Sequence, residues 1–354
     1  MQINKFNTSL FDWYHQTKRD LPFRGIDDPY KIWLSEVMLQ QTQVATVIPY
    51  FERWIQRFPT LESVAKAEQE QLLKMWEGLG YYSRCRNFHK AAQMVMKKFD
   101  GIIPDTWDEF RSLPGVGDYT AAAVLSIAFG HPLSVIDGNV KRVMSRVLGL
   151  KQLTRHNLSR IKNMLTNIIP IENPGDFNQA MMELGASHCS PKNPNCGVCP
   201  VSHSCRAFQT GSPELYPALI KKPIVPHYEI VVGLIWRGDS FYIQKRGEGG
   251  MLAGLWEFPG GKVEKDESLE NALLRELKEE CGISPKILKK IGTIKHAYTH
   301  FKITFHGFHC KENGTSIQAM HNSKWIKPEE IVNHTFPKAN HKLFSILNDQ
   351  GWHV

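Results

Sequence analysis

Long apolar runs are missing from this chain of 354 residues. No stretch of 18 consecutive apolar residues is present, which argues against a membrane-spanning helix. The first twenty residues also lack the apolar core of a secretory signal peptide, so we expect a cytoplasmic protein. No internal repeat is visible. A hydrophobic content of 42% is sufficient for buried cores, and the length predicts two domains.

Cysteine is scarce and unevenly spread, with seven residues in the whole chain. Four of them lie within 17 residues, as Cys189, Cys196, Cys199 and Cys205. An odd total and one tight group do not suit secreted disulfides. Four thiolates at C-x6-C-x2-C-x5-C spacing suit a tetrahedral metal ion or an iron–sulfur cluster, and the spacing alone leaves zinc and iron both open. The other three, Cys85, Cys281 and Cys310, are most simply explained as buried thiols.

The apolar pattern changes along the chain. Residues 1–205 carry apolar side chains at three- and four-residue spacing, which predicts helices, and the long pattern over 33–58 is expected to break at Pro49. Residues 206–226 hold four prolines and little periodicity, as expected of a linker. From residue 227 on, β-rich runs surround one clear helical pattern. The sequence therefore predicts an all-α domain followed by an α+β domain over 227–354.

A glycine turn is the most informative local feature of the first domain. Gly115 and Gly117 allow close approach of the backbone to a ligand, and a small-residue helix is expected from Tyr119 to Phe129. Backbone N–H groups at such a helix start form an anion site. With a net charge of +8, a nucleic-acid backbone is a natural anion. An ordinary corner between two helices is the alternative.

The glycine turn, the downstream Asp137 and the cysteine spacing together resemble the helix-hairpin-helix DNA glycosylase superfamily, in its iron–sulfur branch. The resemblance covers the whole first domain, with the hairpin at 113–129 and a cluster loop at 189–205. It implies a [4Fe–4S] cluster on the four grouped cysteines. It also implies double-stranded DNA as partner, a monomer, and, in a bacterium, a place in the nucleoid.

Two positions favour a resemblance to the adenine DNA glycosylase (MutY) family within this branch. Bifunctional members carry a Lys two residues after the Gly-x-Gly turn, which forms a Schiff base. Tyr119 occupies this position, and a phenol cannot form an imine. Glu36, in SEVMLQQTQV, matches an acid of the adenine glycosylases that endonuclease III lacks. An acid on an amphipathic helix is usually solvated, but in a dry pocket its pKa would rise, as a general acid requires.

Asp137 has the complementary setting. It stands at an expected helix start with Lys141 four residues on, where helix N–H groups and a cation favour the carboxylate. A plain N-cap is the alternative. Two carboxylates in opposite protonation states suit cleavage of a glycosidic bond. We expect Glu36 to protonate the leaving adenine at N7 while Asp137 stabilises the oxocarbenium ion.

The resemblance also implies contacts to DNA and to the flipped base. The implied DNA contacts are Gln41, Tyr81, Gly115, Gly117 and Lys141. The implied adenine pocket contains Arg24 and Glu183, with Tyr119 and Asn139 in supporting roles. Phe23 stands where the family usually has Trp, so one wall of this pocket is expected to differ.

The second domain contains a complete Nudix box, G-x5-E-x7-R-E-L-x-E-E-x-G-I, over residues 261–283. Three carboxylates fall on one helical arc and indicate a Mg²⁺ site: Glu276, Glu279 and Glu280. An acidic solvated helix is the alternative. The corresponding domain of the family typically lacks an intact box and reads 8-oxoguanine through a Phe-Ser-His motif, here Tyr298, Thr299 and His300. We favour recognition alone over additional hydrolysis of a nucleoside triphosphate, because a shared fold does not establish a shared activity.

The expected function is therefore hydrolysis of the N-glycosidic bond of adenine opposite 8-oxoguanine or guanine, in base-excision repair. Two alternatives remain at this point. One is an endonuclease III-like glycosylase with lyase activity. The other is an iron–sulfur DNA-binding protein without catalysis.

Overall fold

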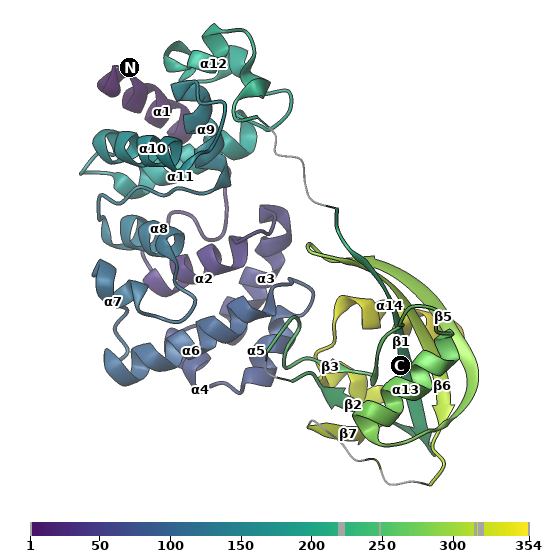
Figure 1. The fold of residues 1–354 in the computed structure, drawn as a ribbon. Helices are drawn as coiled ribbons and strands as arrows, with labels where there is room; N and C mark the ends of the chain where they lie inside the picture. Colours follow the sequence, from purple (N-terminus) through teal and green to yellow (C-terminus); the bar gives the residue numbers. More distant parts are fainter. Residues whose placement is uncertain (1, 219–223, 248, 315–316, 318–321, 353–354) are drawn as a thin grey trace. The chain divides into compact units, whose positions relative to one another are not determined.

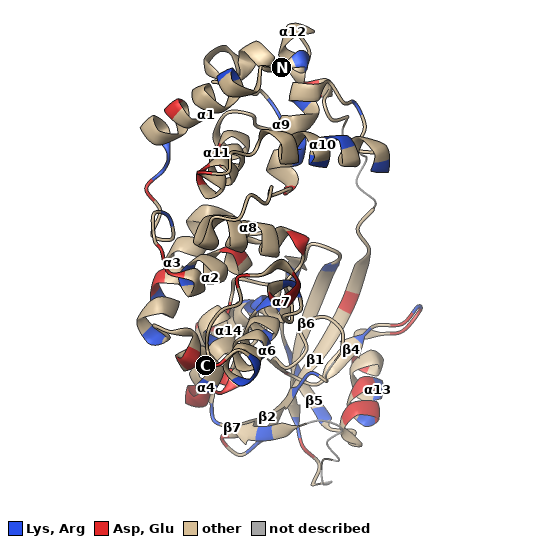
Figure 2. Ribbon diagram, turned by 90° about the vertical axis from the view of Figure 1, so that its left-hand side faces the viewer, with Lys and Arg blue, Asp and Glu red and all other residues tan. Residues whose placement is uncertain are grey.

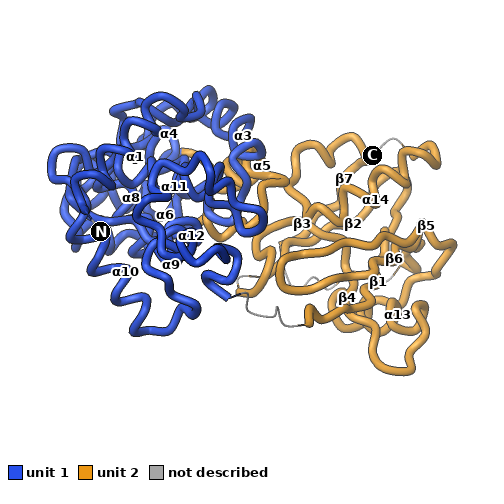
Figure 3. The backbone as a smooth tube through the Cα atoms, turned by 90° about the horizontal axis from the view of Figure 1, so that it is seen from above, with its two compact units in different colours: residues 1–66, 87–221 blue, residues 67–86, 222–354 orange. Residues whose placement is uncertain are grey.

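The computed structural model describes residues 2–218, 224–247, 249–314, 317 and 322–352. The chain forms two compact units, the first made of residues 1–66 and 87–221, the second of 67–86 and 222–354 (Figure 3). Residues 67–86 thus group with the C-terminal unit, although they lie inside the range expected for the helical domain. No helix among the described residues is long and apolar enough to cross a membrane.

The N-terminal unit is built from helices, as the apolar spacing predicts (Figure 1). Its helices are α1 (Ile3–Thr17), α2 (Pro29–Leu39), α3 (Val44–Arg57), α4 (Leu61–Lys66), α6 (Tyr82–Lys98, from Asn87 on), α7 (Trp107–Arg111), α8 (Asp118–Phe129), α9 (Gly138–Leu148), α10 (Arg155–Ile168), α11 (Pro174–Ser187) and α12 (Arg206–Gln209). Two short 3-10 turns lie within the cysteine loop, η1 (Cys196–Val198) and η2 (Ser202–Ser204), and a third, η3 (Pro213–Leu215), follows it. The segment expected as a linker therefore begins with α12 and includes η3.

Helix α8 is the centre of the N-terminal unit. It contacts α2 and α11, and it is buried without interruption from Thr120 to Ser126. Its small side chains allow this close packing. A Cβ atom on Gly175 of α11 would lie 2.9 Å from both the Ile127 Cα and the Ser126 carbonyl oxygen. The small-residue pattern thus allows the last turn of α8 to lie close to α11.

The expected helix break at Pro49 is wrong. Pro49 lies inside α3, and the chain turns earlier, between α2 and α3, where Gln41 adopts a φ of 57°. A proline within a helix removes one backbone hydrogen bond. Complete burial of Val47 and Trp54 on the same helix stabilises α3 despite this loss.

The C-terminal unit contains one mixed sheet with strand order β3-β2-β1-β6-β5, with β4 paired to β1 and β7 to β2. Its elements are α5 (Gln69–Trp76), β1 (His227–Arg237), β2 (Ser240–Lys245), β3 (Trp256–Glu257), β4 (Gly260–Lys262), α13 (Leu269–Cys281), β5 (Lys286–Ala297), β6 (Lys302–Lys311), β7 (Ser323–Ile326), η4 (Pro328–Asn333) and α14 (Lys338–Asp349). Strands β1 and β6 run parallel, in register from His227 opposite Lys302. The expected α+β character of this domain is confirmed.

Each face of this sheet carries its own helix. Val232 and Leu234 of β1 pack in the cluster that contains α14, whereas Val231 packs in the cluster that contains α13. This alternation is the period of two that a strand imposes on its side chains. Gly307 marks the close approach of α14, because a Cβ there would lie 2.7 Å from the Leu343 Cδ1 atom.

Candidate active site

Glu36 lies in the interior of the N-terminal unit, on α2. This helix begins where the Asp28 carboxylate accepts a hydrogen bond from the Tyr30 amide, followed by Pro29 at the first helical position. Glu36 is only 6% exposed. Its carboxylate lines a cavity of about 170 Å³, where the Tyr119 hydroxyl donates a 2.6 Å hydrogen bond to its Oε2 atom.

Burial makes this carboxyl group a weaker acid than an ordinary glutamate. Desolvation by burial is the largest cause that raises the pKa of Glu36, and the Asp137 charge adds to it. The Tyr119 hydrogen bond and the Arg24 charge oppose the rise, and the net pKa is about 7. Burial and the Glu36 charge also raise the pKa of Tyr119 well above its ordinary value, so the phenol stays a donor. A carboxyl with a pKa near 7 is suited to proton transfer at neutral pH.

Asp137 lines the same cavity as Glu36. It is the N-cap of α9, and its Oδ1 atom accepts a 2.6 Å hydrogen bond from the Val140 amide. Asp137 therefore caps α9 and also borders the cavity. Asn139 also lines this cavity, and its side-chain oxygen accepts a 2.8 Å bond from Arg142, whose Nε donates to the Cys189 carbonyl oxygen.

Two arginines hold Glu183 at another wall of the cavity. Arg19 donates to both carboxylate oxygens at 2.6 and 2.9 Å, and Arg24 donates to Oε2 at 2.8 Å. These bonds lower the pKa of Glu183 against the effect of its burial. Phe23 is also part of the lining. The structure thus brings the expected pair Arg24 and Glu183 together and adds Arg19, which sequence reasoning missed.

The other residues with expected DNA contacts in the N-terminal unit lie outside the cavity lining. Gly115 has a φ of 78°, and a Cβ there would lie 2.7 Å from the Asn87 Cβ, so the turn requires glycine. Gly117 is the N-cap of α8, one residue earlier than the expected helix start would place it. Lys141 lies in the first turn of α9 and Gln41 is exposed in the α2–α3 turn. Their contact with DNA stays a prediction.

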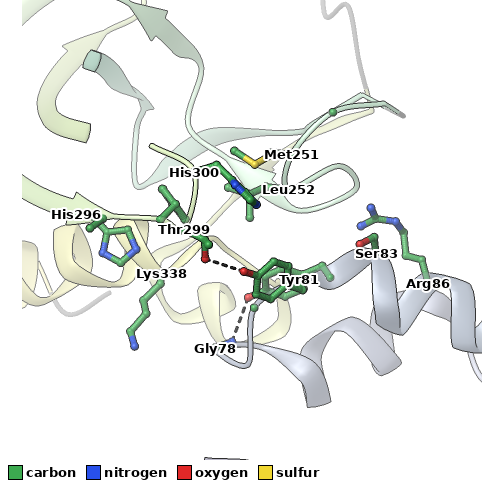
Figure 4. Close-up of a pocket in the computed structure, with 15 residues that line it drawn as sticks. Gly78, Tyr81, Ser83, Arg86, Met251, Leu252, His296, Thr299, His300 and Lys338 are labelled. Atoms are coloured by element: carbon green, nitrogen blue, oxygen red, sulfur yellow. Dashed lines mark hydrogen bonds between the residues drawn. The ribbon is translucent and has the colours of Figure 1, made fainter. Parts of the chain in front are cut away.

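The expected recognition residues of the C-terminal unit surround a recess of about 370 Å³ (Figure 4). Thr299 accepts a 2.7 Å hydrogen bond from the Tyr81 hydroxyl. Tyr81 has a φ of 50°, a conformation that costs a bulky residue energy and is frequent at binding sites. Tyr298 and His300 also line the recess. The three motif residues and Tyr81 therefore border one concave surface.

The four grouped cysteines line a single small cavity of the N-terminal unit. Within the part of the chain that the structure describes, no three His, Cys, Asp or Glu side chains are grouped to hold one metal ion. Four thiols that border a common cavity are a donor set that an iron–sulfur cluster uses. The Arg146 guanidinium donates a 3.2 Å hydrogen bond to the Cys189 sulfur. These residues fit an iron–sulfur cluster. Cys85, Cys281 and Cys310 are buried free thiols, as expected.

The three Nudix-box glutamates lie on α13, where acidic residues are coloured red on the ribbon in Figure 2. Arg275 pairs with Glu267 and Glu276 at 3.0 Å and with Glu279 at 3.4 Å. Glu280 instead accepts bonds from Gln244 and from the Gly260 amide. Arginine thus neutralises two of the three expected magnesium ligands, and the third is bonded elsewhere. As arranged here, the three carboxylates do not converge on a cation.

Comparison with known proteins bears on both units. Residues 34–167 match the HhH-GPD superfamily of base excision DNA repair proteins, and residues 189–205 match the iron–sulfur binding domain of endonuclease III. Residues 231–345 match the NUDIX domain. The adenine DNA glycosylase of Mus musculus is 35% identical over 98% of this chain and 78% of its own length. That of Buchnera aphidicola (strain Sg) is 32% identical over 98% of this chain and 100% of its own.

The chain belongs to the adenine DNA glycosylase family. The resemblance found in the sequence and the expected fold class are thereby confirmed. Solved structures agree for the N-terminal part. A thermostable thymine-DNA glycosylase aligns with a TM-score of 0.54 and 26% identity over 58% of this chain and 98% of its own. Endonuclease III trapped covalently on DNA aligns with a TM-score of 0.51 and 26% identity over 60% and 99%.

Proposed function

We propose that this protein is a monofunctional glycosylase that hydrolyses the N-glycosidic bond of adenine paired with 8-oxoguanine or guanine in duplex DNA. The observation that carries the proposal is the cavity shared by Glu36 and Asp137, with Tyr119 bonded to the former. One carboxyl there has a pKa near 7 and the other is held by a helix N-terminus. Family membership supports adenine as the base removed.

The reaction follows from the protonation of these two groups. Adenine leaves the base stack and enters the cavity. Protonated Glu36 gives its proton to N7, the bond between C1′ and N9 breaks, and its electron pair stays with the base. The Asp137 carboxylate stabilises the positive charge on the sugar. Water adds to C1′ and loses a proton to solvent, leaving an abasic sugar and free adenine.

The arginine-held Glu183 has a different role in the proposal. Its carboxylate is charged and fixed by Arg19 and Arg24, so it can accept a hydrogen bond from an amino group. Adenine carries such a group at C6. We assign Glu183 and Arg24 to orientation of the base, and Tyr119 and Asn139 to positioning of Glu36 and Asp137.

The proposed cofactor is a [4Fe–4S] cluster held by Cys189, Cys196, Cys199 and Cys205. When bound, it would cross-link a loop that has little regular structure of its own. Arg146 connects this loop to α9 through bonds to the Ser190 and Pro191 carbonyl oxygens. Hydrogen bonds of Arg146 thus connect the cysteine loop to α9, the helix that Asp137 caps.

Recognition of the base opposite adenine is the role we propose for the C-terminal unit. Support comes from the recess bordered by Tyr81, Tyr298, Thr299 and His300. The Thr299 hydroxyl replaces the serine hydroxyl of the family motif. The decisive comparison is the rate of adenine release from A:8-oxoguanine and A:guanine duplexes. Thr299→Ala should reduce the ratio of the two rates, whereas an unchanged ratio would remove Thr299 from recognition.

Magnesium binding at Glu276, Glu279 and Glu280 stays a prediction, and we propose recognition without nucleotide hydrolysis. Arg275 competes for two of these carboxylates. Full-length protein with Mg²⁺ and oxidised dGTP should release no pyrophosphate or phosphate. Release that Glu279→Gln abolishes would establish a hydrolase instead.

The lyase alternative has a direct test. Since Tyr119 replaces the Schiff-base lysine, borohydride should trap no protein on duplex DNA that contains the lesion. A strong covalent adduct would favour a bifunctional enzyme. An inert wild-type protein on all mispairs would favour a DNA-binding protein without catalysis.

A further inference from the structure

The loop that carries Tyr81 has an unusual backbone. It follows α5 and lies within residues 67–86, which belong to the C-terminal unit. Gly78, Gly80 and Tyr81 have φ values of 92°, 79° and 50°. A positive φ is open to glycine but costs a tyrosine energy, so it persists only where surrounding contacts hold the chain in place. Contacts at the start of this loop therefore bear on where the Tyr81 ring lies.

Glu77 joins the start of this loop to a distant segment of the same unit. It is the C-cap residue of α5, and its side chain is 16% exposed. The Oε1 atom accepts a 2.8 Å hydrogen bond from the Phe336 amide and lies 2.9 Å from the His341 Nε2 atom. The Oε2 atom accepts a 2.7 Å bond from the Lys74 ammonium group. Burial acts to raise the pKa of Glu77, but these donors outweigh it and hold the pKa below its ordinary value.

A second glutamate fixes the other end of α5. Glu70 lies in the first turn of α5, and its Oε1 atom accepts a hydrogen bond from the indole N–H group of Trp256 on β3. Its Oε2 atom lies 3.3 Å from the Lys245 ammonium group on β2. Glu70 and Glu77 are seven residues apart, a spacing that places them on one side of a helix. Carboxylates thus connect both ends of α5 to the C-terminal unit.

The far end of the loop is held by an exposed contact. The 2.7 Å bond from the Tyr81 hydroxyl to Thr299 lies at the border of the recess (Figure 4). Water and DNA compete with an exposed hydrogen bond, so this bond contributes little to the position of the ring. The bonds of Glu77 involve a charged group and are largely shielded from water, so they contribute more.

The contacts of Glu77 lead to the recognition motif by a short path. His341 lies on α14, and α14 packs against β5. Strand β5 leads directly into the motif at 298–300. The carboxylate therefore connects the Tyr81 loop to the strand that precedes the motif.

We propose that Glu77 is a positioning residue for Tyr81, and that its carboxylate makes the Tyr81 loop and the motif at 298–300 read the opposite base as one unit. The inference rests on the proposed role of Tyr81 and Thr299 in recognition of that base. Glu77 acts through Tyr81 and does not touch the DNA. Without this carboxylate the ring takes up other positions, and the preference for A:8-oxoguanine over A:guanine falls.

Single-turnover adenine release at a series of protein concentrations tests this role in the full-length protein. Glu77→Ala should reduce the preference for A:8-oxoguanine over A:guanine about tenfold. The loss should come from a higher half-saturating protein concentration on A:8-oxoguanine, because the saturating rate is set at Glu36 in the other unit. Glu68→Ala is the matched control, since Glu68 is exposed at the start of the same helix and its side chain makes no capping bond. A loss confined to the saturating rate would contradict the proposal.

A second mutation shows whether Glu77 acts through Tyr81. Tyr81→Ala should itself reduce the preference, and Glu77→Ala should then cause no further loss in the Tyr81→Ala protein. An equal loss in both backgrounds would overturn the positioning role. Unchanged preference in Tyr81→Ala would refute the proposed recognition itself, whereas unchanged preference in Glu77→Ala alone would refute only the role of Glu77.

A variant on the other side of the contact decides the question if Glu77→Ala does not fold. His341→Ala keeps the carboxylate and removes one of its donors. It should cause a smaller loss of preference, again absent in the Tyr81→Ala protein. Wild-type preference in His341→Ala would then overturn the proposal.

Discussion

The Tyr119 hydroxyl donates a 2.6 Å hydrogen bond to the Oε2 atom of Glu36 inside the cavity. This bond stabilises the ionised carboxylate, whereas burial favours the neutral acid, and burial prevails to give a pKa of about 7. Tyr119, at the position of the Schiff-base lysine, thus lowers the pKa of Glu36.

Removal of this bond should change the pH dependence of catalysis. Glu36 must be protonated to act, so the wild-type rate should fall as the pH rises through about 7. Tyr119→Phe removes a bond that lowers the pKa of Glu36, so its decline should move to higher pH. Single-turnover rates between pH 5.5 and 9 measure this. Tyr50→Phe is the control, and an unmoved decline in Tyr119→Phe would contradict the role of the bond.

Stability should show the same preference for low pH at this residue. The pKa of Glu36 rises from 4.5 to about 7 on folding, so wild type loses stability as the pH rises between these values. The loss is about 3 kcal/mol in the free energy of unfolding. Glu36→Gln should not show this pH-dependent loss when the free energy of unfolding by denaturant is compared at pH 4.5 and 8. Equal pH dependence of the two proteins would show that Glu36 ionises freely.

The two arginines at Glu183 should contribute unequally. The Arg24 side chain is 13% exposed and the Arg19 side chain 44%. Arg24→Ala should therefore lower the free energy of unfolding by about 2 kcal/mol or more, and Arg19→Ala by about 1 kcal/mol or less. Urea unfolding measures both, with the exposed Arg155→Ala as control. An equal or larger effect of Arg19→Ala would refute this ranking.

Much of the fold was predictable because local patterns determine it. The glycine turn places the start of α8 within one residue of the expected position, and the Nudix box places α13. Family motifs identified Glu36 and Asp137, and the structure places both at one cavity. Such patterns act over a few residues, so they survive without tertiary information.

The features that sequence analysis missed depend on distant partners. Arg19 lies in an ordinary polar stretch, and its partner Glu183 is 164 residues away. Asn340 looks like a helix-surface residue until the fold buries it at a cavity. Pro49 predicted a break that the packing of α3 overrides. Helix α14 was not expected from the sequence, although its apolar residues have helical spacing. Its place in the fold becomes clear only from its burial against the sheet.

Iron content tests the cysteine site. Purified protein should be brown, with broad visible absorption, and Cys199→Ser should lose colour and iron together. Cys310→Ala removes a buried thiol of the C-terminal unit and should keep both. A colourless wild-type protein loaded with zinc would refute the cluster.

The central claim is that Glu36 is the acid that releases adenine. Single-turnover excision from an A:8-oxoguanine duplex at pH 7 tests it most directly. Glu36→Gln should be slower than wild type by about 10²- to 10⁴-fold, whereas the exposed control Glu52→Gln should react at the wild-type rate. Excision by Glu36→Gln at the wild-type rate would contradict the account.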